Sequence, residues 1–121
     1  GVVRVATLER TLVDVFDAPG KVGSWEEIWR SLEMVECFDL DAVIEYARKL
    51  GSAIACARVG FFLEQHRAAL MVEGTHLAGL REMAPREPRY FDPKRGPGKF
   101  VSAWNLLVSE QLITRAWEEV I

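Results

Sequence analysis

Four polar residues near the start of the chain have the types and the spacing of a small functional site. Glu9, Arg10, Thr11 and Asp14 follow one another closely within a segment of helical periodicity. A carboxylate beside a guanidinium suits acid–base chemistry or partner binding, and Arg10 and Asp14, one helical turn apart, can pair. The alternative is that these side chains join the first helix to its neighbours through ion pairs and hydrogen bonds. We interpret them as structural, with Glu9 in the first turn, where the helix dipole favours a carboxylate.

Other polar patterns in the chain fail the tests for nucleotide or metal chemistry. Neither Gly-Lys pair, at residues 20–21 and 98–99, has the upstream glycine and the following Ser or Thr of a phosphate-binding loop. The histidines His66 and His76 are farther apart than metal-binding pairs on one helix, and His66 is expected to end a helix. No serine has the surroundings of a nucleophile. We therefore expect no catalytic residue, no metal and no cofactor.

Positive charge gathers in one segment of a chain whose net charge is −3. In residues 81–99 the basic side chains outnumber the acidic ones, which suits an acidic protein surface or a nucleic-acid backbone. The alternative is a solvated loop with scattered charge. The residues that we predict to bind a partner are Arg86, Arg89, Lys94, Arg95 and Lys99.

Helical periodicity predicts most of the elements that position these residues. Apolar residues recur every three or four positions in several segments, which predicts helices over 7–18, 24–32, 39–50, 52–66 and 109–117, with short helices within 67–84. Ser24 with Glu27 forms a capping box, Asp39 and Ser52 are N-caps, and Gly51 ends a helix. The helix over 52–66 is apolar on more than one face and is expected to be central.

Strands are expected in the remaining segments. Residues 2–6 alternate weakly, and two further strands, near 88–91 and over 99–108, flank a proline- and glycine-rich loop. The predicted fold is one α+β domain, residues 1–121, mostly helical, with a small and mainly antiparallel sheet formed by these three segments. Within the central helix, we expect Gly60 to let a neighbouring helix approach closely.

Composition narrows the class of protein. Half of the 121 residues are hydrophobic and about a quarter are charged, as in globular domains. No apolar run is long enough to cross a bilayer, so we expect no membrane contact and a cytoplasmic location. Cys37 and Cys56 are expected to be buried small hydrophobic residues. Some of the four tryptophans are expected to be partly exposed, as in a binding interface.

Several blocks of the sequence, in their order and spacing, resemble the C-terminal domain of the AbiEi family. They are ATLERTLVDVFDAP (6–19), GSWEEIWRSL (23–32), FDLDAVIEYARKLGSAIACARVGFFLE (38–64) and WNLLV (104–108). The resemblance covers nearly the whole chain, and the block that contains Glu9, Arg10, Thr11 and Asp14 is among its most specific parts.

The resemblance implies an antitoxin of a type IV toxin–antitoxin system that is also a transcriptional regulator. Members carry an N-terminal winged helix-turn-helix that binds operator DNA, and their C-terminal domain opposes a nucleotidyltransferase-like toxin. Since this chain begins at Gly1 without that N-terminal domain, we expect it to be part of a longer protein.

The expected partners are the cognate toxin, operator DNA through the N-terminal domain and weakly through residues 81–99, and a second copy of the chain. The alternative function is a dimerisation or scaffold domain of a regulator without antitoxin activity. A small enzyme is the third hypothesis, for which the sequence offers no usable set of residues.

Overall fold

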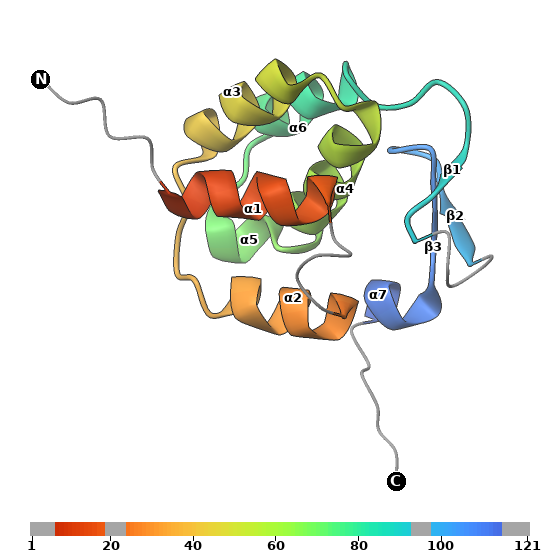
Figure 1. Ribbon diagram of the computed structural model, residues 1–121, viewed down its shortest axis with the longest axis horizontal. Helices are drawn as coiled ribbons and strands as arrows, with labels where there is room; N and C mark the ends of the chain where they lie inside the picture. The colour runs from red at the N-terminus through yellow and green to blue at the C-terminus, as the bar shows by residue number, and fades with distance from the viewer. Residues whose placement is uncertain (1–6, 19–23, 93–97, 115–121) are drawn as a thin grey trace, which may run out of the picture.

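The computed structural model describes residues 7–18, 24–92 and 98–114. Its helices are α1 (Thr7–Asp17), α2 (Trp25–Glu33), α3 (Leu40–Leu50), α4 (Ala53–Gln65), α5 (Arg67–Leu70), α6 (Gly74–Arg81) and α7 (Glu110–Thr114). Its strands are β1 (Arg89–Tyr90), β2 (Lys99–Val101) and β3 (Leu106–Val108). The predicted class, a mostly helical α+β domain with a small sheet, is confirmed (Figure 1).

Local capping signals set the ends of the helices. Ser24 Oγ accepts the backbone N–H of Glu27 at 3.2 Å, and Glu27 Oε1 accepts the backbone N–H of Ser24 at 3.0 Å. Asp39 and Ser52 cap α3 and α4 in the same way with their side-chain oxygens. Gly51 ends α3 with φ of 71°, a left-handed conformation that glycine adopts without steric cost. These predicted ends are confirmed.

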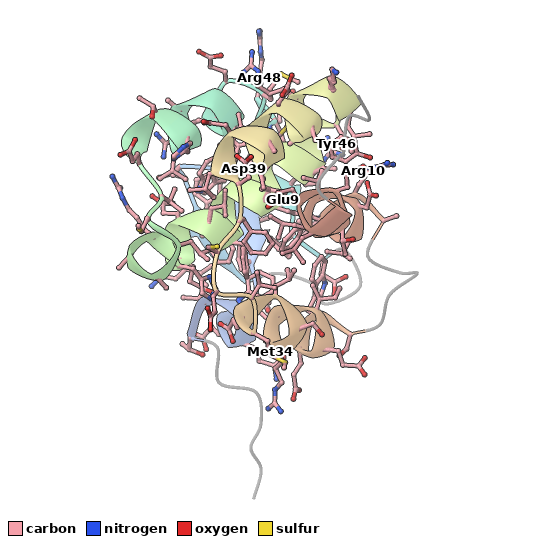
Figure 2. All side chains as sticks on the ribbon, turned by 90° about the vertical axis from the view of Figure 1, so that its left-hand side faces the viewer. Glu9, Arg10, Met34, Asp39, Tyr46 and Arg48 are labelled. Atoms are coloured by element: carbon pink, nitrogen blue, oxygen red, sulfur yellow. The ribbon has the colours of Figure 1, made fainter. Side chains whose placement is uncertain are left out.

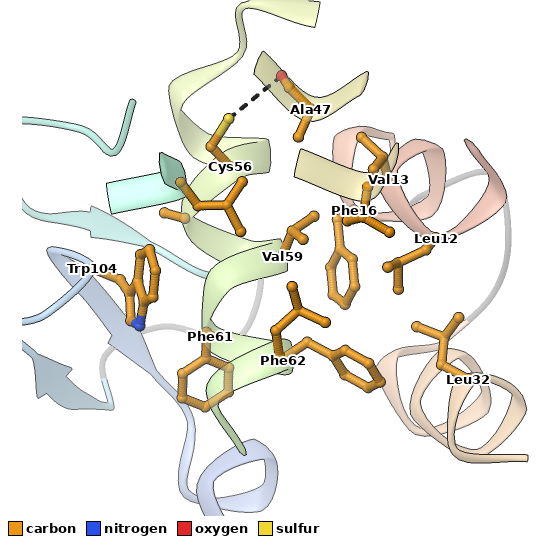
Figure 3. Packing of buried hydrophobic residues seen from close by; sticks show 14 of the residues in the cluster. Leu12, Val13, Phe16, Leu32, Ala47, Cys56, Val59, Phe61, Phe62 and Trp104 are labelled. Carbon is orange, nitrogen blue, oxygen red and sulfur yellow. Dashed lines mark hydrogen bonds between the residues drawn. The ribbon is translucent and has the colours of Figure 1, made fainter. Parts of the chain in front are cut away.

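Helix α4 lies at the centre of the helical layer, as its sequence predicts. Every residue from Ala55 to Leu63 is buried, so all faces of this stretch meet other elements. Figure 1 shows α1, α3 and α6 around it, and Figure 3 shows Val59 and Phe62 directed toward Leu12 and Phe16 of α1. Since burying such a side chain contributes about 1.5–3 kcal/mol, α4 organises the core.

Aromatic rings join α2 to the rest of the core. Phe16 of α1 lies 5.8 Å from Trp25, 5.7 Å from Trp29 and 5.8 Å from Phe62, measured between ring centroids. Phe91, just after β1, lies 4.8 Å from Trp25. Offset and edge-to-face pairs of this kind add to the free energy gained from burial alone. The cluster therefore ties α1, α2, α4 and the sheet together.

Trp104 packs against Gly60, and this contact corrects one prediction. A Cβ on Gly60 would overlap the outer ring atoms of Trp104, so glycine admits an indole ring here and not a second helix. The same ring is fully buried, and its Nε1–H donates to Glu64 Oε1 at 2.8 Å.

The burial of three tryptophans corrects the prediction that some tryptophans are partly exposed. Trp25, Trp29 and Trp104 are all buried, so the prediction of partly exposed tryptophans is wrong for these three. Trp117 lies outside the described residues.

The sheet has three strands in the order β1-β3-β2 within the described residues. Strand β1 is parallel to β3, and β2 is antiparallel to it, so the sheet is mixed. The predicted strand over residues 2–6 lies outside the described residues. The predicted continuous strand over 99–108 is wrong: a turn at 102–105 divides it into β2 and β3. Asn105 has φ of 54° in this turn and donates its side-chain N–H to the carbonyl of Pro85 at 2.8 Å, which holds the reversal in place.

Two further predictions concern the C-terminal helix and the membrane. The helix expected after Ser109 is present as α7, and the rest of its predicted range, residues 115–117, lies outside the described residues. Within the described ranges, no helix has the length and apolar character needed to span a membrane.

Candidate functional site

Glu9 links α1 to the beginning of α3. Its side chain is only 6% exposed, and Oε2 accepts the backbone N–H of Asp39 at 2.6 Å (Figure 2). Asp39 in turn caps α3 through its own side chain. The Glu9 carboxylate therefore satisfies a backbone donor at the point where the chain enters α3.

Arg10 and Asp14 meet at Tyr46 on α3. The Arg10 guanidinium lies over the Tyr46 ring, 5.3 Å from its centroid, and the Tyr46 hydroxyl donates to Asp14 Oδ1 at 3.0 Å. Both residues thus contact one aromatic side chain in place of the ion pair that their spacing allows. Together with Glu9, these contacts hold α1 against α3.

Thr11, the fourth residue of the motif, is exposed on another face of α1. It borders a hollow of about 280 Å³ between α1 and α2, whose lining is Thr11, Val15, Glu27, Ile28, Ser31 and Leu32. The floor is aliphatic, and the Glu27 carboxylate of this lining is engaged in the capping box. Thr11 therefore lies apart from the contacts that Glu9, Arg10 and Asp14 make with α3.

Glu9→Ala tests the link to α3. We expect a loss of about 1–2 kcal/mol in the free energy of unfolding, measured with urea, because the backbone N–H of Asp39 loses the charged acceptor of a part-buried hydrogen bond. Glu9→Gln keeps an acceptor oxygen and should lose less. Glu45→Ala, at an exposed position of α3, is the matched control and should change stability by less than about 0.5 kcal/mol. Equal losses for Glu9→Ala and Glu45→Ala would contradict the link.

The two histidines occupy separate places. His66 ends α4 as predicted, with Nδ1 2.9 Å from the Phe62 carbonyl and Nε2 2.6 Å from Glu33 Oε2. His76 Nδ1 accepts the backbone N–H of Glu73 at 3.0 Å, at the start of α6. In the part of the chain that the structure describes, no group of three or more His, Cys, Asp or Glu residues is placed to hold a metal ion.

Arg58 is a buried cation that sequence reasoning missed. On α4, its Nη1 donates to the Phe16 carbonyl at 2.8 Å and its Nε to the Phe91 carbonyl at 3.0 Å. Burial lowers the pKa of this guanidinium, and the charges of Asp92 and Asp17 act in the opposite direction. The signal was a single arginine within the apolar run of residues 54–63. Its contacts identify it as a link between the end of α1 and the segment after β1.

The cysteines differ in exposure. Cys56 is buried, with Sγ 3.5 Å from the Ala47 carbonyl, whereas Cys37 is exposed. The prediction of burial is therefore confirmed for Cys56 and wrong for Cys37, which lies in the connection between α2 and α3. There it borders a hollow of about 360 Å³ together with Met71 and His76.

Thiol reactivity tests these positions. We expect one fast-reacting thiol in the folded protein with an aromatic disulfide reagent, and two after denaturation. The thiolate is the reactive form, and burial raises the pKa of the Cys56 thiol and shields it. Cys37→Ser should remove the fast phase and Cys56→Ser should leave it. Two fast thiols in the folded wild-type protein would contradict the buried position of Cys56.

The basic residues predicted to bind a partner lie on and beside the sheet. Arg86, Arg89 and Lys99 are exposed, in the segment before β1, in β1 and in β2 respectively. Lys94 and Arg95 lie outside the described residues. Arg81, a further cation of this segment, lies over the Trp104 ring at 4.9 Å and 4.0 Å from Glu64 Oε2, so it has a structural contact.

The outer face of the sheet consists of one row of residues. Tyr90 and Phe100 are both register partners of Leu107, so these three side chains lie on the same side. Leu106 and Val108, which alternate with Leu107, are fully buried on the opposite side. Tyr90 is 43% exposed and Phe100 is 46% exposed. We call this row, Tyr90–Leu107–Phe100, the aromatic row.

The sequence predicted the basic residues as a binding surface, which stays a prediction, and it did not predict the aromatic row. The alternation in the short runs RYF, KFV and LLV was the available signal, but the register that aligns them depends on the turn at 102–105.

Comparison of the chain with protein-family models, with curated proteins and with solved structures finds no match.

Proposed function

We propose that this chain is the antitoxin and regulatory domain of a type IV toxin–antitoxin system, and that it counteracts a nucleotidyltransferase-like toxin by binding. The observation that carries the proposal is the exposure of three cations on and beside the sheet: Arg89 in β1, Lys99 in β2 and Arg86 just before β1. The resemblance of the sequence to the AbiEi family supports the class of partner. Lys94 and Arg95, which the sequence predicts to bind the same partner, lie outside the described residues.

Binding accounts for the described polar residues better than catalysis does. Glu9, Arg10 and Asp14 are engaged in contacts between α1 and α3, and Arg58 bonds to two buried carbonyls. Exposed cations at the rim of a surface steer an acidic partner toward it and select among partners.

The regulatory part of the proposal assigns operator DNA to an N-terminal winged helix-turn-helix, with weak help from residues 81–99. This assignment implies that the protein helps to repress its own operon. We also propose a cytoplasmic location, where the operon and the toxin are found. A second copy of the chain is the remaining partner that we propose.

Co-expression with the toxin encoded beside this gene tests the antitoxin activity. We expect the chain alone to restore growth, and the triple variant Arg86→Gln, Arg89→Gln, Lys99→Gln to lose that rescue. The matched control removes three exposed cations from the helices, by Arg30→Gln, Lys49→Gln and Arg67→Gln, and should retain rescue. Absence of rescue by the folded parent chain would favour the alternative, a dimerisation or scaffold domain.

A further inference from the structure

We propose that a groove beside α5 binds a basic amphipathic segment of a partner protein. The groove lies between α5 and the connection from α2 to α3, residues 34–39, and we call it the acidic groove. Apolar side chains of the partner fill it, and lysines or arginines of the partner meet the carboxylates along it. This inference goes beyond the proposed function, because it concerns another face of the domain and a partner segment of positive charge.

Two adjoining hollows form the acidic groove. One has a volume of about 250 Å³ and lies against the end of α2, and the other, of about 360 Å³, lies against the beginning of α3. Because Glu36, Ala69 and Leu70 line both hollows, the two form one continuous strip. Figure 2 shows the connection running down this face between the labelled residues Asp39 and Met34. A strip that reaches from one helix to the next suits a peptide segment, which lays a row of apolar side chains into a groove.

The groove is apolar at its floor and carries one exposed methionine. Val35 and Phe62 line the first hollow, Phe38 and Met71 line the second, and Leu70 lies in both. Met71 is 74% exposed and ends α5 with φ of 58° and ψ of 44°, a left-handed conformation that glycine adopts without the steric cost of a side chain. Burial within the domain does not account for this methionine, whereas an apolar partner packed on its flexible thioether does.

Negative charge lines the groove along its length. Among the described residues, no lysine or arginine lines either hollow, and Arg67, an exposed cation of α5, lies outside both linings. Such a surface repels the phosphates of nucleic acids and of anionic lipids and attracts basic side chains. Charge complementarity therefore favours a basic protein segment as the occupant. The lining carboxylates are those of Glu33, Glu36, Asp39 and Asp41.

Two of these four carboxylates point to solvent and are available to a partner. Glu33 Oε2 lies 2.6 Å from Nε2 of His66, and the Asp39 side chain caps α3, so both have partners within the domain. Glu36 is exposed in the connection. The Asp41 side chain is 94% exposed, although one of its oxygens lies 3.4 Å from a ring nitrogen of the α6 histidine. Glu36 and Asp41 are therefore the carboxylates that we expect to pair with a basic partner.

The test measures fluorescence anisotropy of a labelled synthetic peptide with the full chain. The peptide consists of leucine and lysine and is about 14 residues long, with its leucines on one face of a helix of about four turns. We expect binding that weakens as salt rises, because added ions screen the attraction between exposed charges. A peptide with glutamate at every lysine position is the control and should not bind at about 100 μM protein.

Met71→Gly separates binding from folding. Glycine removes the exposed side chain and relieves the left-handed backbone, so the melting temperature should stay the same or rise while the peptide binds about 5- to 20-fold more weakly. Met71→Leu keeps an apolar side chain and should bind within about twofold of the parent. A purely structural role of the side chain would show itself in a lower melting temperature of Met71→Gly.

Two double variants test the charge of the groove. Glu36→Gln with Asp41→Asn removes both available carboxylates and should weaken binding about 2- to 10-fold. Glu87→Gln with Glu110→Gln is the matched control, because it changes the net charge equally at exposed positions before β1 and in α7. Asp41 and Glu110 both lie in the first turn of a helix, so the two double variants lose a similar interaction with a helix dipole. The control should bind as the parent does.

Several results would overturn the proposal. They are no binding of the basic peptide by the parent at about 100 μM protein, equal binding of the glutamate peptide, unchanged binding by the Met71→Gly variant, and equal weakening in the two double variants. Dimerisation of the parent that Met71→Gly abolishes, measured by analytical ultracentrifugation, would assign the groove to a second copy and overturn the proposal as well. Peptide binding requires no toxin, so growth rescue is read separately: rescue without peptide binding would uphold the proposed function and reject this inference.

Discussion

Gly60→Ala is expected to lower the free energy of unfolding by about 2–3 kcal/mol, although alanine favours a helix by about 1 kcal/mol over glycine. The reason is the Trp104 ring, which occupies the space that a Cβ would need. Because Trp104 is fully buried and Gly60 is buried beside it, the indole cannot move aside without disturbing its neighbours and its hydrogen bond to Glu64. Urea denaturation followed by circular dichroism measures the loss.

Two further variants isolate this clash. Gly74→Ala, at the beginning of α6, places a Cβ in ordinary van der Waals contact with the Arg67 guanidinium, 3.9 Å away, and should keep or slightly raise stability. Trp104→Phe removes the outer ring atoms that the Cβ of Gly60→Ala would meet, so the double variant should lose less stability than the sum of the single losses. Equal effects of Gly60→Ala and Gly74→Ala would contradict the packing described here.

Arg58→Met is expected to lower the free energy of unfolding by about 3–5 kcal/mol. Methionine fills much of the same volume, but it leaves the buried carbonyls of Phe16 and Phe91 without their donor. It also removes a cation that lies 5.7 Å from the Trp25 ring and 5.6 Å from the Phe91 ring. Since Phe91 directly follows Tyr90, this loss should also loosen the attachment of β1.

Arg48→Met is the matched control for Arg58→Met. Arg48 also donates to a backbone carbonyl, that of Gly79 at 2.6 Å, and it pairs with Glu82 at 3.0 Å. Its side chain is 42% exposed, so water can replace the lost donor, and the expected loss is under about 1 kcal/mol. A loss as large as that of Arg58→Met would show that burial is not what makes Arg58 important.

The elements that sequence reasoning predicted well depend on local interactions. The capping box of Ser24 and Glu27, the N-caps Asp39 and Ser52, and the left-handed Gly51 each act within a few residues. The apolar spacing of α2 and α3 likewise reflects one helical period and one buried face, whereas α4 is recognised by apolar residues on all of its faces. These features determined where the helices begin and end, and they determined that α4 is the central helix.

The elements that sequence reasoning missed depend on contacts between distant segments. The division of residues 99–108 into two strands requires the turn at 102–105, which Asn105 anchors to Pro85 and Trp104 anchors to Gly60. The register of the two strands, with Phe100 opposite Leu107 and Val101 opposite Leu106, depends on these contacts, which lie outside the segment itself.

By itself, the sequence determined the helical majority of the domain, the caps of its helices and the concentration of basic residues in 81–99. Only the tertiary structure decided that Arg58 is buried between two carbonyls and that Tyr90 and Phe100 share one face with Leu107. The physical reason is range: capping and helical periodicity act over a few residues, whereas burial and strand register depend on which distant segments pack together.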